Sequence, residues 1–232
     1  MPDVTIKAAD GGIFSAYLSL PKNVGAKVPG IVMMQQIFGV NSEMRGFTDD
    51  YAAKGYIAIC PDLFWRIRPG VQLDPLDKES FPKAIAVARD LDHDKAVEDL
   101  KACVAFLRAH PACNGKVGTL GYCLGGETAY LMAVRSDADC NVGYFGVGIE
   151  KSLDEAANIK KPLLLHIPEQ DRHVPAEAQA QIKAALAGRA ELYAYPNADH
   201  AFNRVGSAAY NAEVTALANQ RSDAFLRRYL GA

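Results

Sequence analysis

Short, continuous runs of apolar residues alternate with segments of helical spacing along most of this chain, and this alternation most constrains its fold. The runs are typical of strands buried on both faces and lie at 30–34, 57–60, 117–121, 142–145 and 163–167. The helical segments lie between or after them, at 43–54, 95–110, 128–135, 176–186 and 208–229. Strands that alternate with helices predict an α/β fold, in which a mostly parallel sheet has helices on both faces.

Two further features complete the expected sheet. Residues 4–8 and 14–20 alternate in polarity around Asp10-Gly11-Gly12, which is typical of a hairpin. Residues 191–195 also alternate, so we expect a strand near a sheet edge. No repeat or change of composition divides the 232 residues, and we therefore expect one domain over 1–232.

Composition argues against several classes of partner. The formal net charge of −2 gives no long-range attraction to nucleic acid or to anionic lipid. The first seven residues lack the pattern of a signal peptide, and no apolar stretch approaches the ~20 residues of a membrane helix. The five cysteines have no paired short spacing. We expect free thiols, a cytoplasmic location, and neither a membrane nor a nucleic-acid partner.

Cys123 is the candidate nucleophile. It lies in Gly121-Tyr122-Cys123-Leu124-Gly125, between an expected strand and an expected helix. A nucleophile elbow needs small residues two positions before and two after the nucleophile, because the turn leaves no room for side chains. The helix N-terminus that follows would favour a thiolate. A buried structural cysteine in a glycine-rich turn is the alternative.

Asp171 and His200 are the candidate partners of Cys123. Asp171 follows the strand at 163–167, where a carboxylate could orient a histidine, and Glu169 is its competitor. His200 follows the strand at 191–195, and His173 is the weaker rival as general base. We expect His166 in the core and His93 and His110 on helix surfaces. None of these three histidines is therefore a candidate for the general base. The order nucleophile, acid, histidine is the hydrolase order.

The loop after the strand at 30–34 should supply an oxyanion donor. The backbone amide of Ile37 is the candidate, and the amide of Leu124 is its expected partner. Donors aimed at a developing oxyanion can each supply about 2.7–4 kcal/mol.

Several motifs together resemble those of one family over nearly the whole chain. Gln-Ile-Phe-Gly-Val-Asn (36–41) and Gly-Tyr-Cys-Leu-Gly-Gly (121–126) form the most specific combination. Gln-Asp-Arg-His-Val-Pro (170–175) and His-Ala-Phe-Asn-Arg (200–204) also match, as do shorter stretches at 60–63, 114–118 and 146–151. On these residues the chain is similar to the dienelactone hydrolase (carboxymethylenebutenolidase) family, which has the α/β-hydrolase fold.

The resemblance implies a function and a set of residue roles. It implies a soluble monomer that needs no cofactor and hydrolyses a small, carboxylate-bearing unsaturated lactone in aromatic degradation. It implies a triad of Cys123, Asp171 and His200, with the Ile37 and Leu124 amides as oxyanion donors. The same resemblance implies that Arg204 holds the substrate carboxylate, for which a planar guanidinium is suited.

Gln36 departs from the family pattern, which usually has a glutamate at this position. The resemblance implies that this carboxylate modulates the nucleophile by accepting the proton of the thiol when substrate arrives. An amide cannot accept a proton at neutral pH. We therefore hypothesise that His200 deprotonates Cys123 directly, which gives a thiolate–imidazolium pair before substrate binds.

Phe81 is the second departure, because an ungapped alignment places it where the family has another carboxylate-binding arginine. Arg66, Arg68 or Arg89 could replace that arginine. The natural substrate could instead be less anionic, or bulkier and more aromatic. The aromatic residues that could line such a pocket, or simply form core, are Phe38, Phe64, Trp65 and Phe81.

The leading hypothesis is therefore hydrolysis of a lactone or activated ester, yielding an acid through a Cys123 thioester. One alternative is a broader carboxylesterase or thioesterase, which Gln36 and Phe81 favour. Another is a non-catalytic module that binds a carboxylate through Arg204, although a binder has no need of a complete triad. A metalloenzyme is disfavoured, because His166, Glu169 and His173 do not have the spacing of zinc motifs.

Overall fold

All eight expected strands join one sheet in the computed structural model, which describes residues 3–22 and 26–231. Met1 and Pro2, the first two of the seven residues that lack a signal-peptide pattern, lie outside the described residues. The strands are β1 (Asp3–Lys7), β2 (Ile13–Ser19), β3 (Val28–Met34), β4 (Ile57–Pro61), β5 (Cys113–Tyr122), β6 (Cys140–Tyr144), β7 (Leu163–Pro168) and β8 (Glu191–Tyr195). Their order is β1-β2-β4-β3-β5-β6-β7-β8.

The pairing is antiparallel at one edge and parallel elsewhere. β1 and β2 form the expected hairpin, and β2 pairs antiparallel with β4. Every other neighbouring pair, from β4–β3 to β7–β8, is parallel. The prediction of a mostly parallel α/β sheet, with residues 191–195 at an edge, is confirmed.

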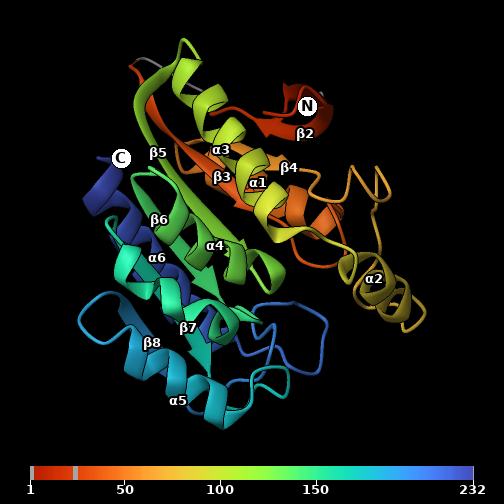
Figure 1. The fold of residues 1–232 in the computed structure, drawn as a ribbon, viewed down its shortest axis with the longest axis vertical. Helices are drawn as coiled ribbons and strands as arrows, with labels where there is room; N and C mark the ends of the chain where they lie inside the picture. The colour runs from red at the N-terminus through yellow and green to blue at the C-terminus, as the bar shows by residue number, and fades with distance from the viewer. Residues whose placement is uncertain (1–2, 23–25, 232) are drawn as a thin grey trace.

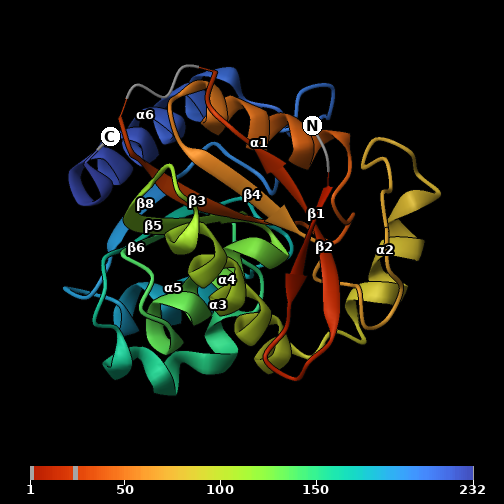
Figure 2. The same ribbon diagram turned by 90° about the horizontal axis from the view of Figure 1, so that it is seen from above.

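Helices cover both faces of the sheet, as expected (Figures 1 and 2). α1 (Ser42–Ala53) and α6 (Ala212–Leu230) pack on one face, where they meet a core that includes Met33, Tyr144 and Phe225. α3 (His93–Ala109), α4 (Leu124–Arg135), the 3-10 helix η1 (Ile149–Asn158) and α5 (Ala176–Ala185) lie on the other face. No described helix has the length and apolarity to span a bilayer.

Two helix boundaries differ from the prediction in ways that affect the site. α4 begins at Leu124, not at 128, because Gly125 and Gly126 have low helix propensity and conceal the first turn. α6 begins after Asn211, whose side chain accepts a hydrogen bond from the Val214 amide at 3.1 Å and caps the helix. Residues 207–211 therefore lie outside the helix, and they line the cavity described below.

Two helices were not predicted. η1 follows β6, and α2 (Ser80–Ala88) lies apart from the two helix layers (Figure 1). α2 is short, and Pro82 in its first turn obscures the pattern. It packs through Val87 in a small cluster with Phe64, Val71 and Leu124, which places it beside the start of α4.

Candidate active site

Cys123 lies in a strained turn between the end of β5 and the start of α4. Its φ of 57° and ψ of −112° fall in a region that non-glycine residues rarely adopt. A Cβ at Gly121 would lie 2.2 Å from the Gly125 carbonyl oxygen, and one at Gly125 would lie 2.1 Å from that of Met34. Both positions therefore require glycine, as the elbow pattern predicts. The half-buried Cys123 lines the largest described cavity.

His200 and Asp171 meet at the same edge of the sheet. His200 Nδ1 lies 2.7 Å from Asp171 Oδ2, and Asp171 Oδ1 accepts a hydrogen bond from the His173 amide at 2.8 Å. The Asp171 side chain is fully buried. Glu169, the competing carboxylate, instead pairs with Lys183 at 2.6 Å.

The electrostatics of His200 connect it to Cys123. Burial by itself would lower the pKa of His200. The charge of the Cys123 sulfur and hydrogen bonds to Asp171 and Cys123 outweigh that effect and raise the pKa to about 10. The raised pKa favours the imidazolium form of His200 when the sulfur is charged. The arrangement can therefore hold a thiolate and an imidazolium together in the free protein.

The rival histidines occupy other environments. His173 packs against His200 with ring centroids 4.7 Å apart, and only its backbone amide reaches Asp171. Burial and the charge of His200 lower the pKa of His173. His166 is in the core, as expected. His93, expected on a helix surface, is half-buried and lines the cavity instead.

The expected oxyanion donors also border the cavity. The close approach of Gly125 to the Met34 and Gln35 carbonyls sets the elbow against the loop that carries Ile37. Among residues 3–22 and 26–231, the amides of Ile37 and Leu124 donate no hydrogen bond to another protein group. Two such donors beside Cys123 could stabilise an oxyanion.

Arg204 lines the cavity but is held by its neighbours. Its Nε lies 3.2 Å from Glu43 Oε1, and its guanidinium also donates to the amide oxygen of Gln36. Gln36 in turn donates to Glu43 Oε2 at 2.9 Å. The guanidinium lies over the ring of Phe38, 5.2 Å from its centroid. A substrate carboxylate would have to compete with Glu43 for this arginine.

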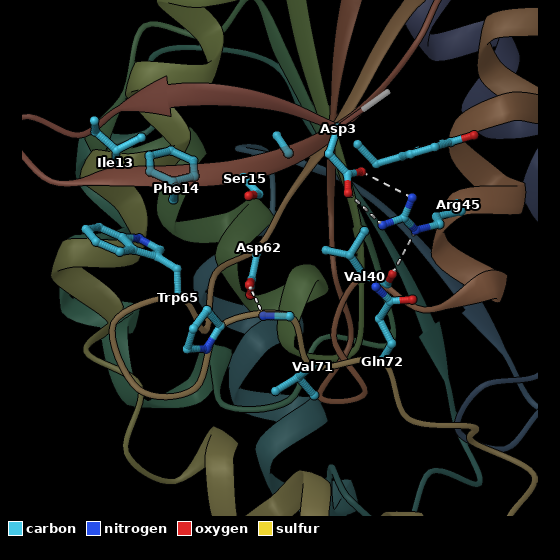
Figure 3. A pocket seen from close by; sticks show the side chains of 14 residues that line it. Asp3, Ile13, Phe14, Ser15, Val40, Arg45, Asp62, Trp65, Val71 and Gln72 are labelled. Atoms are coloured by element: carbon cyan, nitrogen blue, oxygen red, sulfur yellow. Dashed lines mark hydrogen bonds and ion pairs between the residues drawn. The ribbon is translucent and has the colours of Figure 1, made fainter. Parts of the chain in front are cut away.

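Trp65 requires a correction, because it lies outside the cavity that holds Cys123. Its indole donates to Asp99 at 2.8 Å and stacks on Phe14. It lines a smaller pocket of about 280 Å³, next to the β1–β2 hairpin (Figure 3). Phe38 and Phe81 do line the larger cavity, whose volume is about 830 Å³.

Apart from Arg204, the cations of the cavity differ from those expected. Arg66 pairs with Asp10 and Asp99, Arg89 lies 3.7 Å from Asp90, and Arg68 is outside the cavity. Lys78 and Arg172 line it instead. Sequence reasoning missed both, together with Glu43, His93 and Glu127. Arg172 follows Asp171 directly, and this adjacency was the one available signal.

The sheet order, the glycine-framed elbow and the strand-end histidine and carboxylate define an α/β-hydrolase. The sequence profile of the dienelactone hydrolase family matches residues 14–230. This chain therefore belongs to the dienelactone hydrolase family.

Individual relatives agree with this assignment. A carboxymethylenebutenolidase from Pseudomonas putida is 40% identical over 96% of this chain and 94% of its own. A protein from Azospirillum brasilense, provisionally assigned the same name, is 45% identical over the full length of both chains. The crystal structure of a provisionally assigned dienelactone hydrolase from Klebsiella pneumoniae is 26% identical and has a TM-score of 0.86, covering 98% of each chain.

The elbow contact gives a stability prediction. Gly125→Ala places a methyl group against the Met34 carbonyl, so we expect it to lower the free energy of unfolding by more than about 3 kcal/mol. Gly46→Ala is the matched control, since Gly46 lies in α1 with nothing near its added Cβ. It should raise stability by about 0.5–1 kcal/mol. Urea unfolding measures both, and equal effects would contradict this geometry.

Proposed function

We propose that this protein hydrolyses a lactone or activated ester through a thioester on Cys123. The observation that carries the proposal is the position of His200, which lines the same cavity as Cys123 and lies 2.7 Å from the buried Asp171 carboxylate. An imidazole held between a thiol and a buried carboxylate is the arrangement that nucleophilic catalysis requires. Membership of the dienelactone hydrolase family supports lactones as the substrate class.

The first half of the reaction forms the thioester. The Cys123 thiolate attacks the carbonyl carbon, and the resulting oxyanion accepts hydrogen bonds from the Ile37 and Leu124 amides. The intermediate then collapses as the bond to the ring oxygen breaks. His200 gives its proton to that oxygen, with Asp171 fixing the ring. In a lactone the leaving oxygen stays attached, so the ring opens while the acyl group remains on sulfur.

The second half releases the acid. Neutral His200 takes a proton from water, whose oxygen attacks the thioester carbonyl. Collapse of the second oxyanion expels the Cys123 thiolate, and His200 keeps the proton as imidazolium. The resting pair is restored, and the product is the ring-opened acid. The chain's own groups and one water supply every proton in the cycle.

Gln36 fits a mechanism in which His200 alone deprotonates Cys123. The Gln36 amide is engaged by Glu43 and Arg204 and has no basic group to offer. The raised pKa of His200, about 10, supports an imidazolium that is present before substrate arrives. No substrate-triggered proton acceptor is then needed.

The cations of the cavity favour a substrate that bears a carboxylate. Arg204, Arg172 and Lys78 all line it, and their side chains can supply charge-assisted hydrogen bonds. Arg204 would exchange Glu43 for the substrate carboxylate. The proposal thus assigns Glu43 the role of a competing internal anion.

A broader esterase is the second candidate, favoured by the apolar rim of the cavity. Leu76, Phe81 and Ile85 line it and keep 52%, 44% and 46% of their surface exposed. Exposed apolar side chains at a cavity mouth suit an aryl or alkyl ester. Comparing turnover of lactones with and without a carboxylate distinguishes the two candidates.

The thioester can be trapped directly. After a brief reaction with 4-nitrophenyl acetate and acid quench, mass spectrometry should find one acetyl group on the peptide that contains Cys123. Cys123→Ala should lose the label and lower kcat at least about 10³-fold. Cys103→Ala, which removes a buried thiol outside the cavity, should keep both. Unchanged turnover in Cys123→Ala would sink the proposal.

If Arg204 binds the substrate carboxylate, two substitutions should change the KM for dienelactone in opposite directions. Arg204→Met should raise the KM for dienelactone by roughly tenfold to hundredfold, the loss of one charged hydrogen bond. Glu43→Gln should lower that KM, because the guanidinium loses its internal anion. Steady-state kinetics with 4-nitrophenyl acetate provide the uncharged control, whose KM should change little. Equal shifts for both substrates would exclude a carboxylate contact at Arg204.

A further inference from the structure

One part of the cavity wall has no role in the mechanism above. Glu127 and His93 both line the cavity that holds Cys123. Glu127 lies in the first turn of α4, and its amide donates to the Cys123 carbonyl oxygen at 3.1 Å. His93 is the first residue of α3. The backbone of Glu127 therefore lies about one helical turn, ~5.4 Å, along α4 from that of Cys123.

These two side chains face each other across a gap. His93 Nδ1 lies 3.6 Å from Glu127 Oε2, which is beyond hydrogen-bond distance. Within the described part of the chain, His93 Nδ1 is buried and has no hydrogen-bond partner. Buried polar atoms nearly always have a partner, so this nitrogen is available to a ligand that reaches the cavity wall.

The surrounding backbone is shaped to admit the carboxyl group. Glu127 is only 8% exposed, which is unusual for a glutamate without a close partner. Gly148, at φ +106°, contacts it, and a Cβ there would lie 2.7 Å from Glu127 Oε1. The glycine leaves room for the carboxylate at the cavity wall, where apolar packing would have been the simpler solution.

The charges around the pair are mixed. Two cations, Lys151 and Arg135, influence the pKa of both side chains through their charge. Nearby carboxylates oppose them: Glu150 at Glu127, and Asp94 and Asp92 at His93. Burial is the largest effect on both; it raises the pKa of Glu127 to about 7 and lowers the pKa of His93. Burial therefore favours the uncharged form of both side chains. Neither an ammonium nor a carboxylate gains strongly from such a field.

We propose that Glu127 and His93 form a hydroxyl-recognition subsite, so that the preferred substrate is a lactone or ester with a hydroxyl group about one helical turn from the reacting carbonyl. This inference rests on the proposed function, because it takes Cys123 as the nucleophile. A hydroxyl can donate to Glu127 and accept from His93, or the reverse, and so pairs both groups at once. It would bridge the 3.6 Å gap and satisfy the orphaned nitrogen.

Two matched pairs of esters test the subsite on each side of the reacting carbonyl. On the alcohol side, 3-hydroxyphenyl acetate is compared with 3-methylphenyl acetate. On the acyl side, 4-nitrophenyl 3-hydroxybenzoate is compared with 4-nitrophenyl 3-methylbenzoate. For one of these pairs, wild-type kcat/KM should favour the hydroxyl ester roughly tenfold to hundredfold, because the methyl ester leaves buried polar groups without a hydrogen-bond partner.

Variants identify the groups responsible. Glu127→Leu should bring the hydroxyl:methyl ratio close to one, while Glu127→Gln, which keeps an acceptor, should retain most of it. His93→Ala, at a half-buried helix start, provides an independent change less disruptive to folding. It should lower the ratio as well. Glu150→Gln is the control, because Glu150 acts on Glu127 through charge but does not line the cavity. It should leave the ratio unchanged.

The methyl esters separate the two proposals. If wild-type protein hydrolyses them with Cys123 but shows a ratio near one in both pairs, the subsite is overturned and the proposed function stands. A ratio that persists in both Glu127→Leu and His93→Ala overturns it as well. If the methyl esters are hydrolysed equally well by Cys123→Ala, the proposed function itself has failed.

Discussion

The close backbone contact between the elbow and the end of β3 is the constraint on which the rest of the site depends. Gly125 approaches the Met34 carbonyl so closely that no side chain fits between them. That contact fixes where α4 begins, holds Cys123 at a strained φ, and sets the Ile37 loop beside the elbow. The strain is retained because β5, β3 and α4 together determine the turn. The same backbone contact thus positions the proposed nucleophile and the proposed oxyanion donors.

Two buried histidines show how strongly neighbouring side chains determine the pKa of an imidazole in this fold. Burial lowers the pKa of His166 to about 3, and within the described residues its ring nitrogens hydrogen-bond only to the hydroxyls of Tyr195 and Ser222. His200 is also buried, yet its pKa is raised to about 10. The difference is the buried Asp171 carboxylate and the Cys123 sulfur. A neutral histidine anchors α6 to the sheet, whereas a cationic one can serve proton transfer.

Local pattern was enough to predict the sheet, the elbow and the Asp171–His200 pair, because each depends on residues adjacent in sequence or at strand ends. Long-range side-chain contacts were not predictable. Trp65 was placed in the cavity from its aromatic character, but its indole satisfies Asp99 elsewhere. Nothing in the sequence near Glu43 indicates that it pairs with Arg204, 161 residues away. His93 has the pattern of a surface helix residue, and only the packing of α3 beside α4 brings it to the cavity. Glycines concealed the first turn of α4 and hence the position of Glu127.

The proposed mechanism depends most on a charged imidazole next to the sulfur in the free protein. Nitrogen-15 NMR of histidine-labelled protein measures this directly through the His200 ring shifts. The imidazolium signature should persist through neutral pH and titrate near pH 10, and replacing Cys123 with serine should bring that transition to lower pH. A His200 that is neutral at pH 8 and titrates near its ordinary value of about 6.5 would contradict the account.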